Sequence, residues 1–163
     1  MNFNNYTTKS QETIQMAQQI AQSFGHNQIE NEHIFKSLTQ VDENVLPFLL
    51  KKLNININVL NQILDKELER LPKVSGAELM LSREASKTLT EAAVIAKKMQ
   101  DDYVSIEHLI VAIYKSKSNI AQVLKDQGVT EKDLKAAIEE LRKGQRVTSP
   151  SQEETYNSLN KFA

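Results

Sequence analysis

The sequence predicts an all-α protein of eight helices, arranged as two similar four-helix repeats. The main observation is an internal duplication, because the segment Ile29–Ile34 (IENEHI) returns 75 positions later as Val104–Leu109 (VSIEHL). Apolar residues at helical spacing recur at the same offset, so that Ala17 is matched by Ala92. Glycine and proline are scarce, with four and three copies, and lie mostly at the expected junctions. A period this long indicates one duplicated helical unit rather than a short solenoid repeat.

Repeat one spans about residues 7–71, and local signals mark its four expected helices. The hydroxyl of Thr7 or Thr8 can cap the first helix, which runs to about Phe24 and ends at Gly25. The other boundaries are marked by a start near Asn31, by Pro47 in a first turn, by Asn56 as an N-cap and by Pro72 as a stop.

Repeat two spans about residues 82–143 and follows a joining segment at 72–81. Further along, an offset of 74 continues the match, and Leu64 falls on Ile138. The expected N-caps are Ser82, Ser105 and Thr130 for the fifth, sixth and eighth helices, and the seventh helix is expected over about Ile120–Asp126. The two repeats and a short N-terminal arm therefore form one predicted domain over residues 1–143.

Composition narrows the classes of function. The 163 residues include no cysteine, which excludes disulfides, thiolate catalysis and cysteine-zinc sites. The formal net charge is -1 with acidic and basic residues interleaved, so a nucleic-acid partner is not expected. There is no long apolar run or signal peptide, and we expect a cytoplasmic protein without membrane contact.

The composition changes after the second repeat. Residues 144–163 begin with a polar, breaker-rich stretch (GQRVTSPSQ), which is typical of a flexible linker. The chain then ends on residues 159–163 (LNKFA), which resemble the beginning of a further element. We therefore expect a flexible linker over residues 144–163 and a natural protein that continues beyond Ala163.

The duplicated motif carries the residues that could do chemistry. His33 and His108 each follow a glutamate, but a zincin needs two histidines one turn apart, so packing or capping is favoured over metal binding. Glu32 and Glu107 lie in first helical turns, where the helix dipole favours negative charge. Cation binding is the leading functional alternative for these carboxylates. No catalytic residue and no metal ligand is predicted.

Some apolar residues fall outside the helical pattern and could form a binding groove. Val74, Leu79 and Met80 lie in the joining segment, and Tyr6 and Tyr103 lie beside helix starts. An exposed apolar groove would mark a binding site, whereas a loop tucked onto the core would not. Both alternatives stay open at this point.

The duplicated motif also carries a family resemblance. Phe24–Ile34 (FGHNQIENEHI) and Val104–Leu109 are similar to the two repeat signatures of the N-terminal domain of Clp-type AAA+ unfoldases. The resemblance covers residues 1–143 and the linker. Two further segments, Leu71–Gly76 (LPKVSG) and Leu159–Ala163, resemble the ClpB-type disaggregase branch.

This resemblance implies a fold and a function. The parent protein would be a homohexameric, ATP-driven disaggregase that uses ATP and magnesium and works with the DnaK chaperone system. The chain itself would be a monomeric, non-enzymatic domain without a cofactor of its own. It would capture unfolded or aggregated polypeptides through an apolar groove and hand them to the ATPase ring.

The resemblance also implies which residues contact substrate. In ClpB-type domains the positions that match Thr7, Asp101 and Glu107 are implicated in substrate handling, and Leu89 and Ile95 match an apolar groove. A further apolar groove position falls on His108, which makes the groove more polar here. Tyr103, beside the second motif, completes the expected set.

Other functions stay open. The ClpC branch resembles this chain as well and binds adaptors and arginine-phosphorylated proteins, with glutamates that match Glu32 and Glu107 on the phosphoarginine. The segment Leu71–Gly76 counts against that branch. Two further alternatives are a free-standing helical enzyme or metalloprotein, which predicts turnover or bound metal, and a structural spacer, which predicts no peptide binding.

Overall fold

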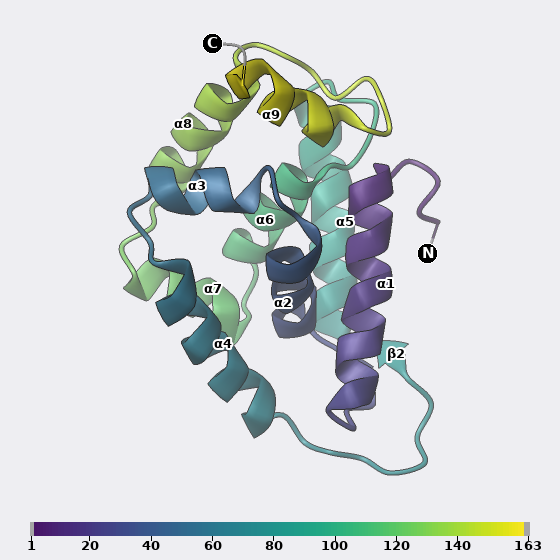
Figure 1. Cartoon of the computed structure of the whole chain (residues 1–163). Coiled ribbons are helices and arrows are strands. Elements are labelled where there is room, and N and C mark those ends of the chain that lie inside the picture. Colours follow the sequence, from purple (N-terminus) through teal and green to yellow (C-terminus); the bar gives the residue numbers. More distant parts are fainter. Residues whose placement is uncertain (1, 162–163) are drawn as a thin grey trace.

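The computed structural model describes the backbone of residues 2–161 and the side chains up to Tyr156. Within this part the protein is all-α apart from one very short two-stranded sheet (Figure 1). Repeat one comprises α1 (Thr8–Ser23), β1 (Gln28–Ile29), α2 (Asn31–Val41), α3 (Leu46–Lys52) and α4 (Ile57–Arg70). Repeat two comprises β2 (Met80–Leu81), α5 (Arg83–Lys98), α6 (Ile106–Lys115), α7 (Asn119–Asp126) and α8 (Glu131–Arg142), and α9 (Gln152–Lys161) follows.

All eight predicted helices are present, and most begin at the predicted caps. The Oγ1 atom of Thr7 accepts the backbone N–H of Ser10 (3.1 Å), and Ser82 caps α5 in the same way. Gly25, which ends α1, has a φ of 74°, and Gln100 occupies the matching place after α5 with a φ of 60°. The duplicated sequence therefore produces a duplicated backbone, including its left-handed residues.

The two repeats are joined by a reciprocal exchange of backbone pairs. The strand β1, which precedes α2, pairs in parallel with β2, which precedes α5. In the same manner Val104, just before α6, forms a parallel bridge with Tyr6, just before α1. The segment ahead of the second helix of each repeat thus pairs with the segment ahead of the first helix of the other.

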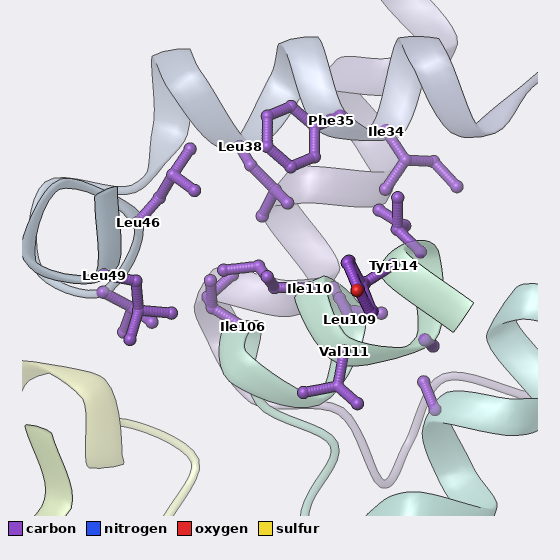
Figure 2. Packing of buried hydrophobic residues seen from close by; sticks show 14 of the residues in the cluster. Ile34, Phe35, Leu38, Leu46, Leu49, Ile106, Leu109, Ile110, Val111 and Tyr114 are labelled. Carbon is purple, nitrogen blue, oxygen red and sulfur yellow. The ribbon is translucent and has the colours of Figure 1, made fainter. Parts of the chain in front are cut away.

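The core lies between the second helices of the two repeats (Figure 2). Phe35 and Leu38 of α2 face Ile106 and Ile110 of α6, and all four side chains are buried. Deleting such a fully buried large side chain typically costs about 2–5 kcal/mol. Leu79 and Leu81 of the joining segment pack against this core, whereas Met80 is 63% exposed.

The structure differs from the prediction after α8. The sequence predicts eight helices and a flexible linker over 144–163, whereas the structure has a ninth helix, and residues 147–156 pack onto the domain (Figure 1). Val147, Glu153 and Tyr156 are buried there. Their partners lie far away in the chain, so local composition gave no signal of this packing. Phe162 and Ala163, which belong to the predicted start of a further domain, lie outside the described residues.

Within the described part of the chain, no helix is both long and apolar enough to cross a membrane.

Candidate functional site

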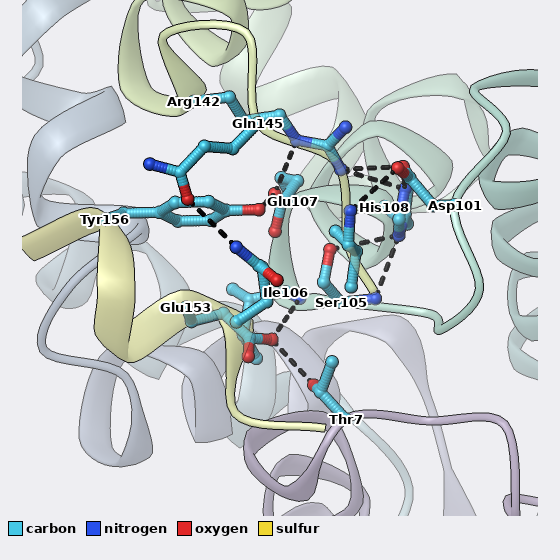
Figure 3. A network of polar contacts seen from close by, with 12 residues as sticks. Thr7, Asp101, Ser105, Ile106, Glu107, His108, Arg142, Gln145, Glu153 and Tyr156 are labelled. Carbon is cyan, nitrogen blue, oxygen red and sulfur yellow. Dashed lines mark hydrogen bonds and ion pairs between the residues drawn. The ribbon is translucent and has the colours of Figure 1, made fainter. Parts of the chain in front are cut away.

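The first candidate site is a buried polar cluster at the start of α6 (Figure 3). It combines Asp101 from the turn after α5, Glu107 and His108 from the first turn of α6, and Arg142 from the last turn of α8. His108 Nδ1 accepts the backbone N–H of Ser105 (2.8 Å). The ring hydrogen therefore lies on Nε2, which donates to Asp101 Oδ2 (2.7 Å).

Arg142 forms an ion pair with each of the two carboxylates of this cluster. Its Nε donates to Glu107 Oε2 and its Nη2 donates to Asp101 Oδ2, both at 2.8 Å. Burial favours a raised pKa for both acids, but the positive charge of Arg142 outweighs burial at Glu107 and holds its pKa below the usual range. At Asp101, hydrogen bonds from His108, the Val147 N–H and Arg142 have the same effect on the pKa. Both acids are therefore ionised at neutral pH.

The C-terminal segment contributes two more side chains to the cluster. Tyr156 donates its hydroxyl hydrogen to Glu107 Oε2 (2.8 Å). Glu153 Oε2 accepts hydrogen bonds from the Thr7 hydroxyl (2.6 Å) and from the Ile106 N–H (3.1 Å). Burial raises the pKa of Glu153 to about 7, and the negative charge of Glu107 adds to this effect.

Repeat one builds the matching position without these charges. His26 stands where repeat two has Asp101, and His33 matches His108. His33 Nδ1 accepts the Glu30 N–H (2.8 Å), so its Nε2 donates to His26 Nδ1 (2.8 Å). Leu68, which is fully buried, stands where repeat two has Arg142. Both duplicated histidines therefore cap their helices, as the sequence predicted.

The two glutamates of the duplicated motif are buried rather than presented to solvent. Glu32 is 6% exposed, and its Oε2 accepts the backbone N–H of Ile120 (3.0 Å). Glu107 is 0% exposed and contacts Arg142 and Tyr156. The described residues contain no group of three or more histidine and acidic side chains that could hold a metal ion.

The second candidate site is an apolar hollow between α5, α6 and α8, with a volume of about 290 Å³. Its floor is apolar and its rim is mainly basic. The lining residues are Ile95, Met99, Val111 and Ile138 on the apolar side and Lys98, Lys115, Lys135 and Glu139 on the charged side. Such a hollow can take one large apolar side chain of a partner and place charged groups around it.

The matching position in repeat one carries a lysine instead of a valine. Lys36 stands where repeat two has Val111. The Lys36 ammonium group lies 2.9 Å from Asp65, which is the residue that matches Glu139, and 3.3 Å from the side-chain oxygen of Asn61. At this position, repeat one therefore has a paired charged side chain where repeat two has a buried valine that lines the hollow.

The structure does not bring the predicted substrate residues to one groove. Ile95 lines the hollow just described, whereas Leu89 lines a separate, shallower hollow beside the N-terminal arm, with Tyr6 and Val94. Thr7, Asp101, Glu107 and His108 meet in the polar cluster, where they contact other residues of the chain. Tyr103 is half-buried next to them. Contact of these residues with substrate stays a prediction.

Several residues of both sites were missed from the sequence: Met99, Val111, Ile138, Arg142, Glu153 and Tyr156. For Val111 and Arg142, the comparison of the two repeats in the sequence contained a signal. Aligning the repeats places Val111 opposite Lys36 and Arg142 opposite Leu68. In each pair one repeat has a charged side chain and the other an apolar one; Lys36 is half-buried and the other three are buried. Such a mismatch between duplicated helices marks a place where the two repeats differ in packing.

Comparison with known proteins agrees with this architecture. The family model described as "Clp repeat (R) N-terminal domain" matches residues 5–127. The chaperone protein ClpB of Bacteroides thetaiotaomicron is 48% identical over the whole chain, which spans 19% of that protein. The structure resembles the Hsp104 N-terminal domain from Candida albicans with a TM-score of 0.82 at 22% identity, covering 92% of this chain and 99% of that one.

A structure of the ClpV N-domain in complex with a VipB peptide has the same fold, with a TM-score of 0.71 and 15% identity over 84% of this chain and 86% of that one. The duplicated motif, the paired repeats and the family match over residues 5–127 agree. The chain therefore belongs to the Clp repeat N-terminal domain family.

Proposed function

We propose that the chain is the polypeptide-capturing N-terminal domain of a ClpB-type chaperone. The support is its 48% identity to a ClpB chaperone, of which it spans about a fifth. In this proposal the rest of the parent protein is an ATP- and magnesium-dependent homohexamer in the cytoplasm that works with DnaK. The domain binds unfolded or aggregated polypeptide and passes it to that ring, without enzymatic activity of its own.

The observation that carries this proposal is the apolar hollow beside Ile95. It is open beside Val111 in repeat two, whereas repeat one has Lys36, paired with Asp65, at the matching position. Unfolded chains expose apolar side chains, and burying one of leucine or phenylalanine size contributes about 1.5–3 kcal/mol. A ClpV N-domain, which shares the fold, has been solved with a bound peptide.

The small binding free energy per buried side chain suits a domain that must release its substrate. Ordering a bound polypeptide offsets part of the burial, so each contact with the hollow is weak and tolerant of sequence. Several copies of the domain around one ring would raise the effective concentration of captured polypeptide without tighter individual contacts. Weak binding by each domain therefore remains compatible with efficient capture.

The test fills the hollow with the side chain that repeat one uses. In Val111→Lys, the new ammonium group can reach Glu139, as Lys36 reaches Asp65. We expect binding of a reduced, carboxymethylated model protein, measured by NMR titration, to fall about tenfold or more. Val59→Lys makes the same exchange at an exposed position of α4 and is expected to bind like the unchanged chain.

Two further variants separate the possible outcomes. Met99→Glu puts a charge into the apolar lining of the hollow at a half-buried residue. It provides the test if the Val111→Lys variant does not fold, which circular dichroism would reveal. Val94→Lys alters the other hollow, beside Leu89. Unchanged binding in both Val111→Lys and Met99→Glu would refute the Ile95 hollow as the site. Loss in Val94→Lys alone would assign capture to the Leu89 hollow.

The phosphoarginine alternative is less favoured by the geometry. A phosphoarginine guanidinium would need the carboxylates of Glu32 and Glu107, but both are buried and already accept hydrogen bonds within the chain. At Glu107 the ligand would have to displace Arg142. Saturable chemical-shift changes at both glutamates on titration with phosphoarginine would restore this alternative.

A further inference from the structure

Residues 147–156, here called the strap, close over the polar cluster through a series of polar contacts. The Val147 N–H donates to Asp101 Oδ1 (3.0 Å), and the Val147 carbonyl accepts the Asp102 N–H (2.8 Å). The Pro150 carbonyl accepts the Thr8 N–H (2.9 Å). Glu153 and Tyr156 then complete the contacts at the start of α6 (Figure 3).

Two of these contacts satisfy free helix N-termini. The first backbone N–H groups of a helix have no acceptor within the helix. Thr8 is the first residue of α1 and Ile106 is the first residue of α6. The strap offers a carbonyl to one amide and the Glu153 carboxylate to the other, while the same carboxylate accepts from the Thr7 hydroxyl. The strap therefore recognises the start of both helices at once.

Only repeat two is built to receive such a segment. In repeat one, His26 and His33 form a hydrogen bond with each other, and Leu68 stands at the position that matches Arg142. In repeat two, Asp101 keeps Oδ1 for the Val147 N–H, and Glu107 Oε2 accepts from Tyr156 as well as from Arg142. Asp101 and Glu107 thus offer hydrogen-bond acceptors to a segment that lies outside both repeats.

The docking also carries features that favour release. The Oε1 atoms of Glu107 and Glu153 are buried without a hydrogen-bond partner among the described residues, which is costly for carboxylates. The two acids also lie close enough for the charge of Glu107 to raise the pKa of Glu153. The strap leaves the domain through Lys143 and Gly144, both with positive φ and both exposed. Two exposed residues with positive φ thus precede the strap, and its docked contacts include carboxylate oxygens without a partner among the described residues.

We propose that the starts of α1 and α6, together with Glu107 and Arg142, form an exchangeable docking site for a Glu-x-x-Tyr segment. The strap occupies the site in cis and opens as one unit. Three-residue spacing puts the carboxyl and the phenol on one helical face, so the site takes an acidic-aromatic helical segment. A segment of another polypeptide with the same chemistry competes for the site when the strap opens.

Hydrogen exchange of the full chain, followed by NMR, tests the opening. The amides of Thr8, Asp102, Ile106 and Val147 all depend on strap contacts. We expect them to exchange at a common rate, faster than the amides in the middle of α6. Exchange of these four amides at the core rate would show that the strap opens only on global unfolding and would refute the proposal.

Substitutions of Glu153 and Tyr156 test whether these two side chains hold the strap in its docking site. Glu153→Ala and Tyr156→Phe are each expected to speed exchange at the four strap-dependent amides, Glu153→Ala by about tenfold or more. Glu69→Ala removes an exposed carboxylate from α4, outside the strap, and is the control. The phenylalanine variant loses only a hydroxyl, so it keeps the test valid if the alanine variant disturbs the fold. Unchanged exchange in both variants would contradict a Glu-x-x-Tyr site.

A separate peptide that carries the Glu-x-x-Tyr motif tests whether another segment can take the place of the strap at the docking site. A synthetic peptide of residues 147–161, at about millimolar concentration to match a tethered segment, is added to the Glu153→Ala chain. It is expected to slow exchange at Thr8 and Ile106 again, whereas the same peptide carrying Glu153→Ala is not. Equal effects of the two peptides, or none from either, would refute recognition of the carboxylate. Neither result bears on the hollow beside Ile95.

Discussion

Arg142 offers the sharpest test of the polar cluster, since repeat one shows which residue can replace it. Leu68 occupies the matching position, so the variant Arg142→Leu gives repeat two the apolar side chain of repeat one. We expect this variant to lower the free energy of unfolding by about 3–5 kcal/mol. A leucine fits the helix, so the loss reports on charge rather than on helix propensity.

The magnitude follows from what the substitution leaves behind. Arg142 bonds to Glu107 and Asp101 at 2.8 Å, and both carboxylate side chains are 0% exposed. Removing one partner of a buried ion pair leaves a buried charge without compensation, and that is the source of the 3–5 kcal/mol range. Here two carboxylates lose the same partner. Protonation of one of them would relieve part of the strain, so the loss should shrink as the pH falls.

Urea denaturation followed by far-ultraviolet circular dichroism measures the loss. At an unchanged slope of about 1–3 kcal/mol per molar urea, the midpoint should fall by at least about 1 M. The double variant Arg142→Leu with Asp101→His copies repeat one further and removes one of the two stranded charges. It should be more stable than the single variant. A single-variant loss below about 1 kcal/mol, or a double variant that is less stable still, would refute this account of the cluster.

Three more predictions follow from the same contacts. Burial raises the pKa of Glu153 from 4.5 to about 7 in the folded chain, so its contribution to strap docking is full below pH 4.5 and is lost as the pH rises through 7. The protection factor of the Ile106 amide, which corrects for the intrinsic rise of exchange with pH, should fall over that window. Burial lowers the pKa of His33 from 6.5 to about 4, so the contribution of this one side chain to the free energy of unfolding should fall by about 3 kcal/mol as the pH drops from 6.5 to 4, measured by urea denaturation. Asp42 accepts three backbone N–H groups at the start of α3, and Asp42→Ala should cost about 1–2 kcal/mol by the same assay.

Most of the fold could be predicted because its signals are local. A cap such as Thr7 or Ser82 and a left-handed stop such as Gly25 act within one helical turn, and the structure confirms them. The ninth helix was missed for the opposite reason. Its buried residues, Glu153 and Tyr156, are stabilised by partners that are distant in sequence, and the surrounding composition is polar.

The residues predicted to contact substrate do not all lie in one place, and helix geometry explains part of this. Leu89 and Ile95 lie six residues apart on α5, a rotation that places them about 120° from each other around the helix axis. In the structure they line different hollows. Thr7, Asp101, Glu107 and His108 meet in the polar cluster, and their contact with substrate stays a prediction. Their burial could not be foreseen, since it depends on Arg142 and on the strap.

The duplication explains why both candidate sites lie in the second repeat. Two copies of one helical frame pack alike, so a difference between the sites requires a departure from the shared pattern. In repeat one, Lys36 pairs with Asp65 at the position of Val111, and His33 donates to His26 where repeat two has charged partners. In repeat two, Val111 lines an open hollow, and Arg142 pairs with two carboxylates that also accept hydrogen bonds from the strap. The candidate surfaces therefore arise at positions where the two repeats carry different side chains.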